Sequence, residues 1–154
     1  MTPFYLQEEL IKELEKLFEG TNVKVFSQDL PLFEQTQDYT DYVDKKTTYF
    51  PVAIVRLISG ETENKKQDNM YTVTVNIIFG TYDPNNNLQG YKDLINMLDK
   101  TIEYLLKKRI FGGYYELERN IKWQLEEDEF PHYYATIETE WILPKVTLVE
   151  DKYC

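Results

Sequence analysis

The segment from Val73 to Arg109 constrains the fold more than any other part of the chain. It begins with alternating apolar and polar residues, passes through a turn rich in Asn and Asp, and continues with apolar residues at helical spacing. A period of two is typical of a strand with one buried face, and the longer spacing is typical of a helix with one buried stripe. The order strand, turn, helix therefore predicts a helix that packs against a sheet.

Two amphipathic helices are predicted. The first covers about residues 3–19, because Thr2 suits its cap, Pro3 its first turn and Gly20 its end. The second runs from about Leu88 to Lys108 and ends in basic residues, which the helix dipole favours. Its apolar face is formed by Tyr91, Leu94, Ile95, Leu98, Ile102, Leu105 and Leu106. Each helix therefore needs an apolar surface to cover.

The remaining apolar patterns predict strands. They lie near residues 23–26, at 50–58, 71–79, 117–125 and 133–143. Residues 27–49 are predicted to be irregular, and the polar run Ser59–Asn69 is predicted to be a flexible hairpin loop. Because neighbouring strands are joined by hairpins, the expected class is α+β, with a single mainly antiparallel sheet and two amphipathic helices packed on one face.

One domain spanning residues 1–154 is expected, with residues 145–154 as a mobile or partner-bound tail. The alternation also predicts which residues form the core. The covered sheet face should contain Val73, Val75, Ile77, Trp123, Ile137 and Trp141. Leu94, Leu98 and Leu105 of the second helix should cover that face.

Composition narrows the classes of function. The formal net charge is −10, and Lys outnumbers Arg by 14 to 3, so sequence-specific nucleic-acid binding is disfavoured. Cys154 is the only cysteine, which excludes an internal disulfide and a cysteine-based metal site. The N-terminus resembles neither a signal peptide nor a membrane span, so assembly inside a cell is expected and a membrane partner is not.

Candidate motifs for metal binding or catalysis fail on inspection. Asp83, Asn85 and Asn87 have the spacing of a calcium loop, but Leu88 and Leu94 occupy the positions that need Gly and Glu. A turn that caps the following helix is predicted instead. His132, the single histidine, follows the turn at Asp128–Pro131 and is predicted to be structural or exposed. No metal, cofactor or catalytic residue is predicted.

The acidic run Glu126, Glu127, Asp128 and Glu129 has two interpretations. Such runs are usually solvated hairpin tips, because their mutual repulsion keeps them at the surface. Alternatively, the charge forms a negative surface in an assembly, past which DNA or a basic partner moves.

Three stretches together resemble a known family. They are FPVAIVRLISGE, then VTVNIIFGTYDPNNNLQGYKDLINMLDKTIEYLLKKRIFGGYYEL, and finally IKWQLEEDEFPHYYATIETEWILP. The pattern of strand, GTYD turn, helix and closing hairpin resembles the tail-terminator proteins of long-tailed bacteriophages, above all the prophage-borne versions in low-GC bacteria. The likeness covers about Phe50 to Pro144 and ends in E-T-x-W-x-L-P.

The resemblance implies a structural, non-enzymatic subunit of a hexameric ring. Such a ring caps the tail tube, ends its polymerisation and offers a docking surface to the head connector; in contractile systems it also meets the sheath. The implied partners are further copies of the chain, the tail tube protein, and sheath and head-connector proteins. The implied location is a virion or headless phage-tail-like particle (a tailocin), assembled in the bacterial host cytoplasm.

Two polar segments are the predicted assembly contacts. The first comprises Ser59, Gly60, Glu61, Lys65 and Lys66, and the second comprises Glu126, Glu127, Asp128 and Glu129. Two alternative functions remain open at this level. One is another tail or head–tail connector subunit. The other is a small ligand-binding or enzymatic α+β domain, for which Arg56, Arg119 and His132 are the candidate polar residues.

Overall fold

The computed structural model describes residues 2–30, 48–65, 68–85, 87–118, 120–127 and 130–143. Most of the segment predicted to be irregular, and all of the predicted tail 145–154, lie outside these residues. The elements in chain order are α1 (Pro3–Leu17), β1 (Lys24–Ser27), β2 (Val52–Lys65), β3 (Asp68–Tyr82), α3 (Gln89–Lys108), β4 (Ile110–Phe111), β5 (Tyr115–Leu117), β6 (Lys122–Leu125) and β7 (His132–Leu143).

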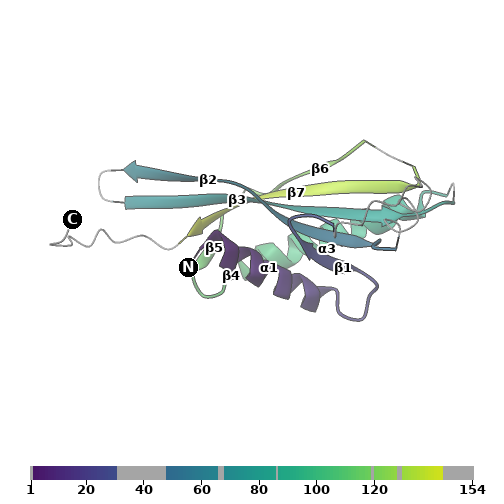
Figure 1. Cartoon of the computed structure of the whole chain (residues 1–154), viewed down its shortest axis with the longest axis horizontal. Helices are drawn as coiled ribbons and strands as arrows, with labels where there is room; N and C mark the ends of the chain where they lie inside the picture. The colour runs from purple at the N-terminus through teal and green to yellow at the C-terminus, as the bar shows by residue number, and fades with distance from the viewer. Residues whose placement is uncertain are drawn as a thin grey trace, which may run out of the picture.

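The strands form one twisted sheet, and the predicted α+β class is confirmed (Figure 1). Its order is β1-β2-β3-β7-β5-β4, with β6 also paired to β7. The sheet is mixed, because β1 runs parallel to β2 whereas the other described pairings are antiparallel. The parallel pair arises because β1 and β2 are not joined by a hairpin.

Both helices cover the same face of the sheet. Odd-numbered residues of β3 and β7 point to this side and are buried with the leucine stripes of the helices, as expected for strands with one covered face. The most deeply buried members include Leu6, Leu10, Leu14, Val75, Ile77, Leu94, Leu98, Leu105, Ile137 and Trp141. We call this the covered face. The predicted core is confirmed for all but one of its named residues.

The exception is Trp123, whose predicted place in the core is wrong because 52% of the residue is exposed. It lies opposite Ile137, so it points to the covered side of the sheet. However, α3 packs over β3 and β7, and β6 lies one strand further out. Tyr91 and Leu106, predicted for the apolar helix face, are also largely exposed at its margin.

The turn before α3 caps the helix as predicted. The Asp83 carboxylate accepts hydrogen bonds from the backbone N–H groups of Gly90 (2.9 Å) and Asn85 (2.9 Å). The Asn87 side-chain oxygen accepts one from the N–H of Gln89 (3.1 Å). A Cβ atom at Gly90 would lie 2.6 Å from that of Asp83, so glycine is required there. These bonds satisfy N–H groups that a helix start leaves without internal partners.

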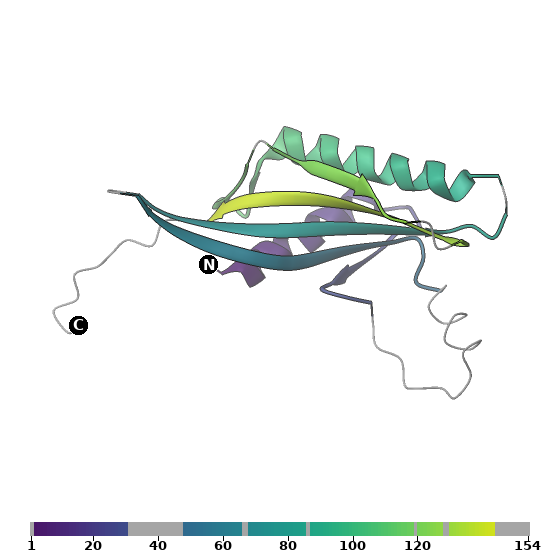
Figure 2. The same ribbon diagram turned by 90° about the horizontal axis from the view of Figure 1, so that it is seen from above.

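The predicted loop Ser59–Asn69 is instead a hairpin of two strands. The ladder between β2 and β3 continues to the pair Lys65 and Asp68, after a register shift between Leu57 and Ser59. Figures 1 and 2 show the two strands projecting beyond the helices at the end where α1 begins. We call residues 59–65 and 68–74 the hairpin arm. Its polar composition reflects exposure rather than lack of structure, because backbone pairing replaces burial.

The predicted strand 117–125 is interrupted. Its first part is β5 and its second part is β6, and both pair with β7. Between them, the Glu118 N–H still donates to the Glu140 carbonyl oxygen (2.8 Å). The alternation of apolar and polar residues therefore predicted correctly that this segment pairs with β7, but it did not predict the interruption between β5 and β6.

A polar contact joins the two helices above the core. The Glu13 carboxylate of α1 accepts hydrogen bonds from the Tyr104 hydroxyl and the Lys108 ammonium (2.6 Å) of α3. Burial acts to raise the Glu13 pKa, but these hydrogen bonds and the nearby charges of Lys108 and Lys16 lower it below its ordinary value. The hydrogen bond to Glu13 likewise raises the pKa of Lys108.

Replacing Leu98 by Ala should destabilise the protein by about 2–5 kcal/mol, because it removes a fully buried side chain and leaves a cavity. Chemical denaturation measures the change. The matched control is Leu106→Ala on the same helix, whose side chain is half exposed and should contribute much less. Equal losses in the two variants would contradict the assignment of the buried helix face.

Replacing Glu13 by Gln should lower the free energy of unfolding at pH 7 by an amount that shrinks in acid. A carboxylate whose folded pKa is depressed adds stability above its unfolded pKa, and that stability is lost as the pH falls through the folded value. The gap between the original protein and the variant should therefore narrow below about pH 4.5. Denaturation curves from pH 7 to pH 3 measure it, and a constant gap would contradict the role of the charge.

Candidate assembly surface

The face of the sheet opposite the helices is only partly covered. Near one end, Phe50, Val52 and Ile54 form a second apolar cluster, against which Ile78 and Tyr134 pack. Towards the hairpin arm, most even-numbered residues of β3 and β7 on this face are polar and at least partly exposed, although Met70 and Ile142 are apolar. We call this side of the sheet the open face, because neither helix covers it.

The polar part of the open face is acidic. Strand register places carboxylates from the arm, β5 and β7 on this side, and Glu126 joins them through its contact with β7. The acids are Glu61, Glu63, Glu116, Glu126, Glu138 and Glu140, and the described basic residues on this side include Lys24, Arg56 and Lys122. An excess of one charge over a surface creates a field that repels like-charged polymers and attracts cations.

Glu126 is bound to the sheet rather than solvated at a loop tip. Its carboxylate accepts hydrogen bonds from the Gln124 amide (3.0 Å) and the Thr136 hydroxyl (3.1 Å). Its backbone N–H donates to the Tyr134 carbonyl oxygen (3.0 Å). The solvated-tip interpretation is therefore wrong for this residue. Glu127 is exposed, and Asp128 and Glu129 lie outside the described residues.

The other predicted contacts belong to the hairpin arm. Ser59, Gly60 and Glu61 are exposed residues of β2, and Lys65 is its last residue, whereas Lys66 is not described. Glu61 points to the open face because it lies opposite Thr72, whereas Gly60 lies opposite the buried Val73 on the other side. Glu61 and Glu126 therefore share a face, although they come from different strands.

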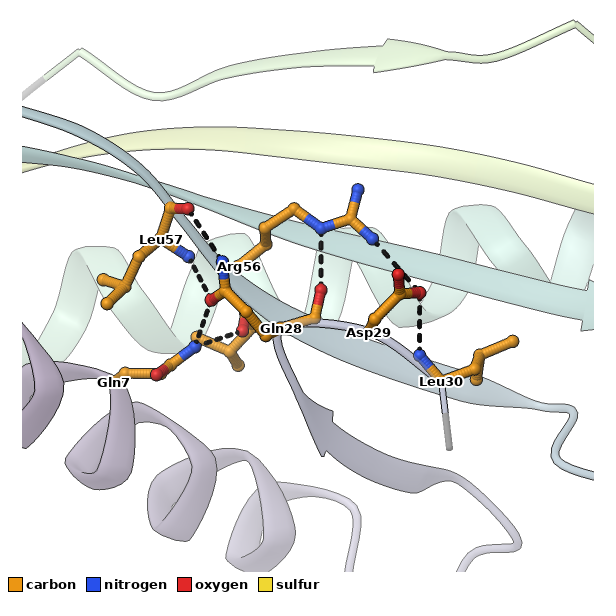
Figure 3. A network of polar contacts seen from close by, with 7 residues as sticks. Gln7, Gln28, Asp29, Leu30, Arg56 and Leu57 are labelled. Carbon is orange, nitrogen blue, oxygen red and sulfur yellow. Dashed lines mark hydrogen bonds and ion pairs between the residues drawn. The ribbon is translucent and has the colours of Figure 1, made fainter. Parts of the chain in front are cut away.

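A network of side-chain amides fixes the point where the arm leaves the body (Figure 3). The Gln28 amide accepts from the Leu57 N–H (2.9 Å) and donates to the Leu57 carbonyl oxygen (3.1 Å). The buried Gln7 amide of α1 donates to Gln28 (2.7 Å) and to the Val55 carbonyl oxygen (2.8 Å). The backbone pairing of β1 with β2 ends at Val55, and the Gln28 side chain makes the two hydrogen bonds to Leu57 that the next residue of a longer β1 would make.

Arg56 completes this network. Its Nε donates to the Gln28 carbonyl oxygen (2.7 Å), and its guanidinium lies 3.5 Å from the Asp29 carboxylate. Gln28 has a left-handed backbone (φ 69°), which non-glycine residues rarely adopt. The contacts of Arg56 hold this turn against the edge of β2, so the arginine has a clear structural use.

His132 also has a structural environment. It is buried, with its ring 4.8 Å from that of Phe50, 5.2 Å from that of Tyr82 and 6.5 Å from that of Tyr134. These contacts confirm the prediction of a structural histidine.

Arg119, the third residue of the enzyme alternative, is outside the described part of the chain. Within the described residues, no three His, Cys, Asp or Glu side chains gather to hold a metal.

Two of the hollows on the described surface lie near the elements discussed above. One, of about 470 Å³, lies on the open face beside β6 and is lined by Asn76, Ile121, Lys122, Trp123, Gln124, Thr136 and Glu138. The other, of about 380 Å³, lies between the end of α1 and the flank of α3, with Phe18, Met97 and Lys100 in its wall. In the described helices, no stretch has the length and hydropathy required to span a membrane.

No protein-family model and no curated protein matches the sequence of this chain. Among solved structures, one similar chain comes from the virion of a native gene transfer agent particle. The two chains are 10% identical with a TM-score of 0.43, and the alignment covers 92% of this chain and 91% of that one. A likeness of this degree carries no functional conclusion.

Proposed function

We propose that this protein is a subunit of a ring that caps the tail tube of a phage or phage-tail-like particle and ends tube polymerisation. The observation that carries the proposal is the division of the sheet into two unlike faces. The covered face holds the core, whereas the open face carries six carboxylates and projects an arm. The sequence from Phe50 to Pro144 resembles tail-terminator proteins, and this resemblance supports a role at the end of a tail.

The acidic open face suits the wall of a channel that conducts DNA. Carboxylates repel the phosphate backbone, so DNA would pass through the channel without binding to its wall. Among the described basic residues on this face, Lys24 donates to the Thr48 carbonyl oxygen and Arg56 is held by Asp29. A channel lined by the open face would therefore repel DNA along the whole length of the channel.

The hairpin arm suits contact with a neighbouring protein. It projects from the body and carries exposed backbone edges, which can pair with another chain. A ring of identical chains needs unlike surfaces that meet repeatedly around an axis. In this proposal six copies form the ring. The arm contacts the next copy or the tube, and the ring then offers a surface to the head connector and, in contractile particles, to the sheath.

Removing the gene from a particle-producing strain should give tails of abnormal and variable length, because the tube then lacks its stop. Electron microscopy of negatively stained particles measures the length distribution, and the complemented strain is the control. Tails of normal length that lack heads would instead assign the protein to the connector, the runner-up role. Unchanged, infectious particles would overturn both assignments.

Shortening the arm by deleting residues 62–71 and closing the strands with a two-residue Asn-Gly turn should leave the fold intact. Among the residues of this section whose side chains are described, Tyr71 is partly buried at the edge of the core, and the others are not core residues. The same change should reproduce the abnormal tail lengths of the gene deletion, because the projecting contact is lost. Thermal denaturation checks the fold, and Glu127→Gln, an exposed acid outside the arm, is the control. Normal tail lengths would show that the arm is only a connection between β2 and β3.

A further inference from the structure

Besides the outer edges of the terminal strands β1 and β4, two further strand edges have no strand partner within the described residues. One is the outer edge of β6, which pairs only with β7. The other is the outer edge of β2 beyond Leu57, because the pairing with β1 stops at Val55 and Gln28 caps the next step. Unpaired edges with exposed apolar residues are sites for pairing with another chain. Such residues are found on both: Trp123 and Leu125 on β6, and Ile58 on β2.

We propose that these two edges pair with each other between neighbouring copies of the chain. In this pairing β6 of one copy lies antiparallel to β2 of the next, with Lys122 opposite Glu61 and Trp123 opposite Gly60. The inference rests on the proposed ring and names the contact that closes it. It also assigns a use to the exposed tryptophan, which the fold itself does not require.

Side chains on the two edges are complementary in this register. Lys122 and Glu61 both point to the open face, so opposite charges would meet there. Trp123 and Gly60 both point to the covered side, where Gly60 has no side chain and the Tyr71 ring, 3.5 Å from the place of a Cβ atom at Gly60, offers the indole an aromatic neighbour. Leu125 (40% exposed) would lie level with Ile58 (49% exposed) at the other end of the pairing. The contact would thus cover the large apolar residues that each free edge exposes.

Strand directions within one copy agree with the pairing. Because β6 is antiparallel to β7, β7 to β3, and β3 to β2, β6 runs opposite to β2. A copy related by rotation keeps these directions, so its β2 meets β6 in antiparallel fashion with the open faces on the same side. The two edges differ, so the contact is heterologous and can close into a ring.

The position of β1 sets the stagger between copies. β1 and Gln28 occupy the edge of β2 from Val52 to Leu57, so the neighbour's β6 must lie further along the arm. Lys122 pairs with Glu138 of β7, which in turn pairs with Asn76 of β3. Glu61 pairs with Thr72 of β3, so the two contact residues are offset by four residues along β3.

The offset of four residues corresponds to about 14 Å along a strand. Each copy contributes four strands between the two contacts, namely β2, β3, β7 and β6, which together span about 19 Å across the sheet. The resulting tilt is roughly 35°, within the range of closed barrels. The register that places Lys122 opposite Glu61 is therefore one that a ring of sheets can close.

A disulfide trap tests this contact in the full-length chain. The variant carries Glu61→Cys and Lys122→Cys, with Cys154→Ser to remove the native thiol. After mild oxidation of the concentrated protein, non-reducing electrophoresis should show a ladder of dimers, trimers and larger species, because each copy is linked on two sides. The matched control replaces Glu61→Cys by Glu116→Cys, another exposed acid of the open face, and should give no ladder. Neither single-cysteine variant should form species beyond a dimer.

Charge variants give a second measurement in the unmodified background. Lys122→Glu places two acids opposite each other and should weaken self-association several-fold, whereas Lys122→Glu combined with Glu61→Lys should restore it. Analytical ultracentrifugation measures the association. No ladder from the 61/122 pair, or equal ladders from the control pair, would overturn the edge contact. The tail-length experiment is independent of it, so abnormal tails without a 61/122 ladder would leave the proposed function standing and reject this interface alone.

Discussion

Burial of two leucine stripes against one face of the sheet is the interaction on which the rest of the structure depends. Leu10 and Leu14 of α1 are fully buried over β1 and β2, and Leu94 and Leu98 of α3 are fully buried over β3 and β7. Because both helices use the same face, neither of them covers the opposite face, which carries an apolar cluster at one end and polar residues towards the arm. The acidic surface, the projecting arm and the exposed strand edges all follow from this one-sided packing of the described helices.

Much of this arrangement could be predicted from the residues. The alternation in β3 and β7 and the helical spacing of Leu94, Leu98 and Leu105 place apolar side chains on one side of each element, which fixes the class and the core. The capping turn at Asp83 follows from its side-chain chemistry, and so does the cap at Asn87. These features are local or periodic, and a single sequence carries both kinds of information.

The candidate surface was harder to predict because its features depend on neighbours. Trp123 alternates as a core residue does, and only the position of β6 beyond α3 leaves it exposed. The alternation of Tyr71 and Val73 indicates a strand from residue 71 onwards, but residues 59–69 contain almost no apolar side chain, so their pattern is that of a loop. Glu126 appeared to belong to a repelling run, yet Gln124 and Thr136 bind its carboxylate to the sheet.

The register shift between Leu57 and Ser59 has a consequence for how this chain can vary. Before the shift, odd-numbered residues of β2 point to the helices; after it, Gly60 does, and Glu61 points to the open face. The extra residue thus decides which side of the arm carries charge. Insertion or loss of one residue at this point would turn the glutamates to the opposite side while leaving the composition almost unchanged. The arm should therefore tolerate exchanges of polar residues in evolution far better than changes in its length.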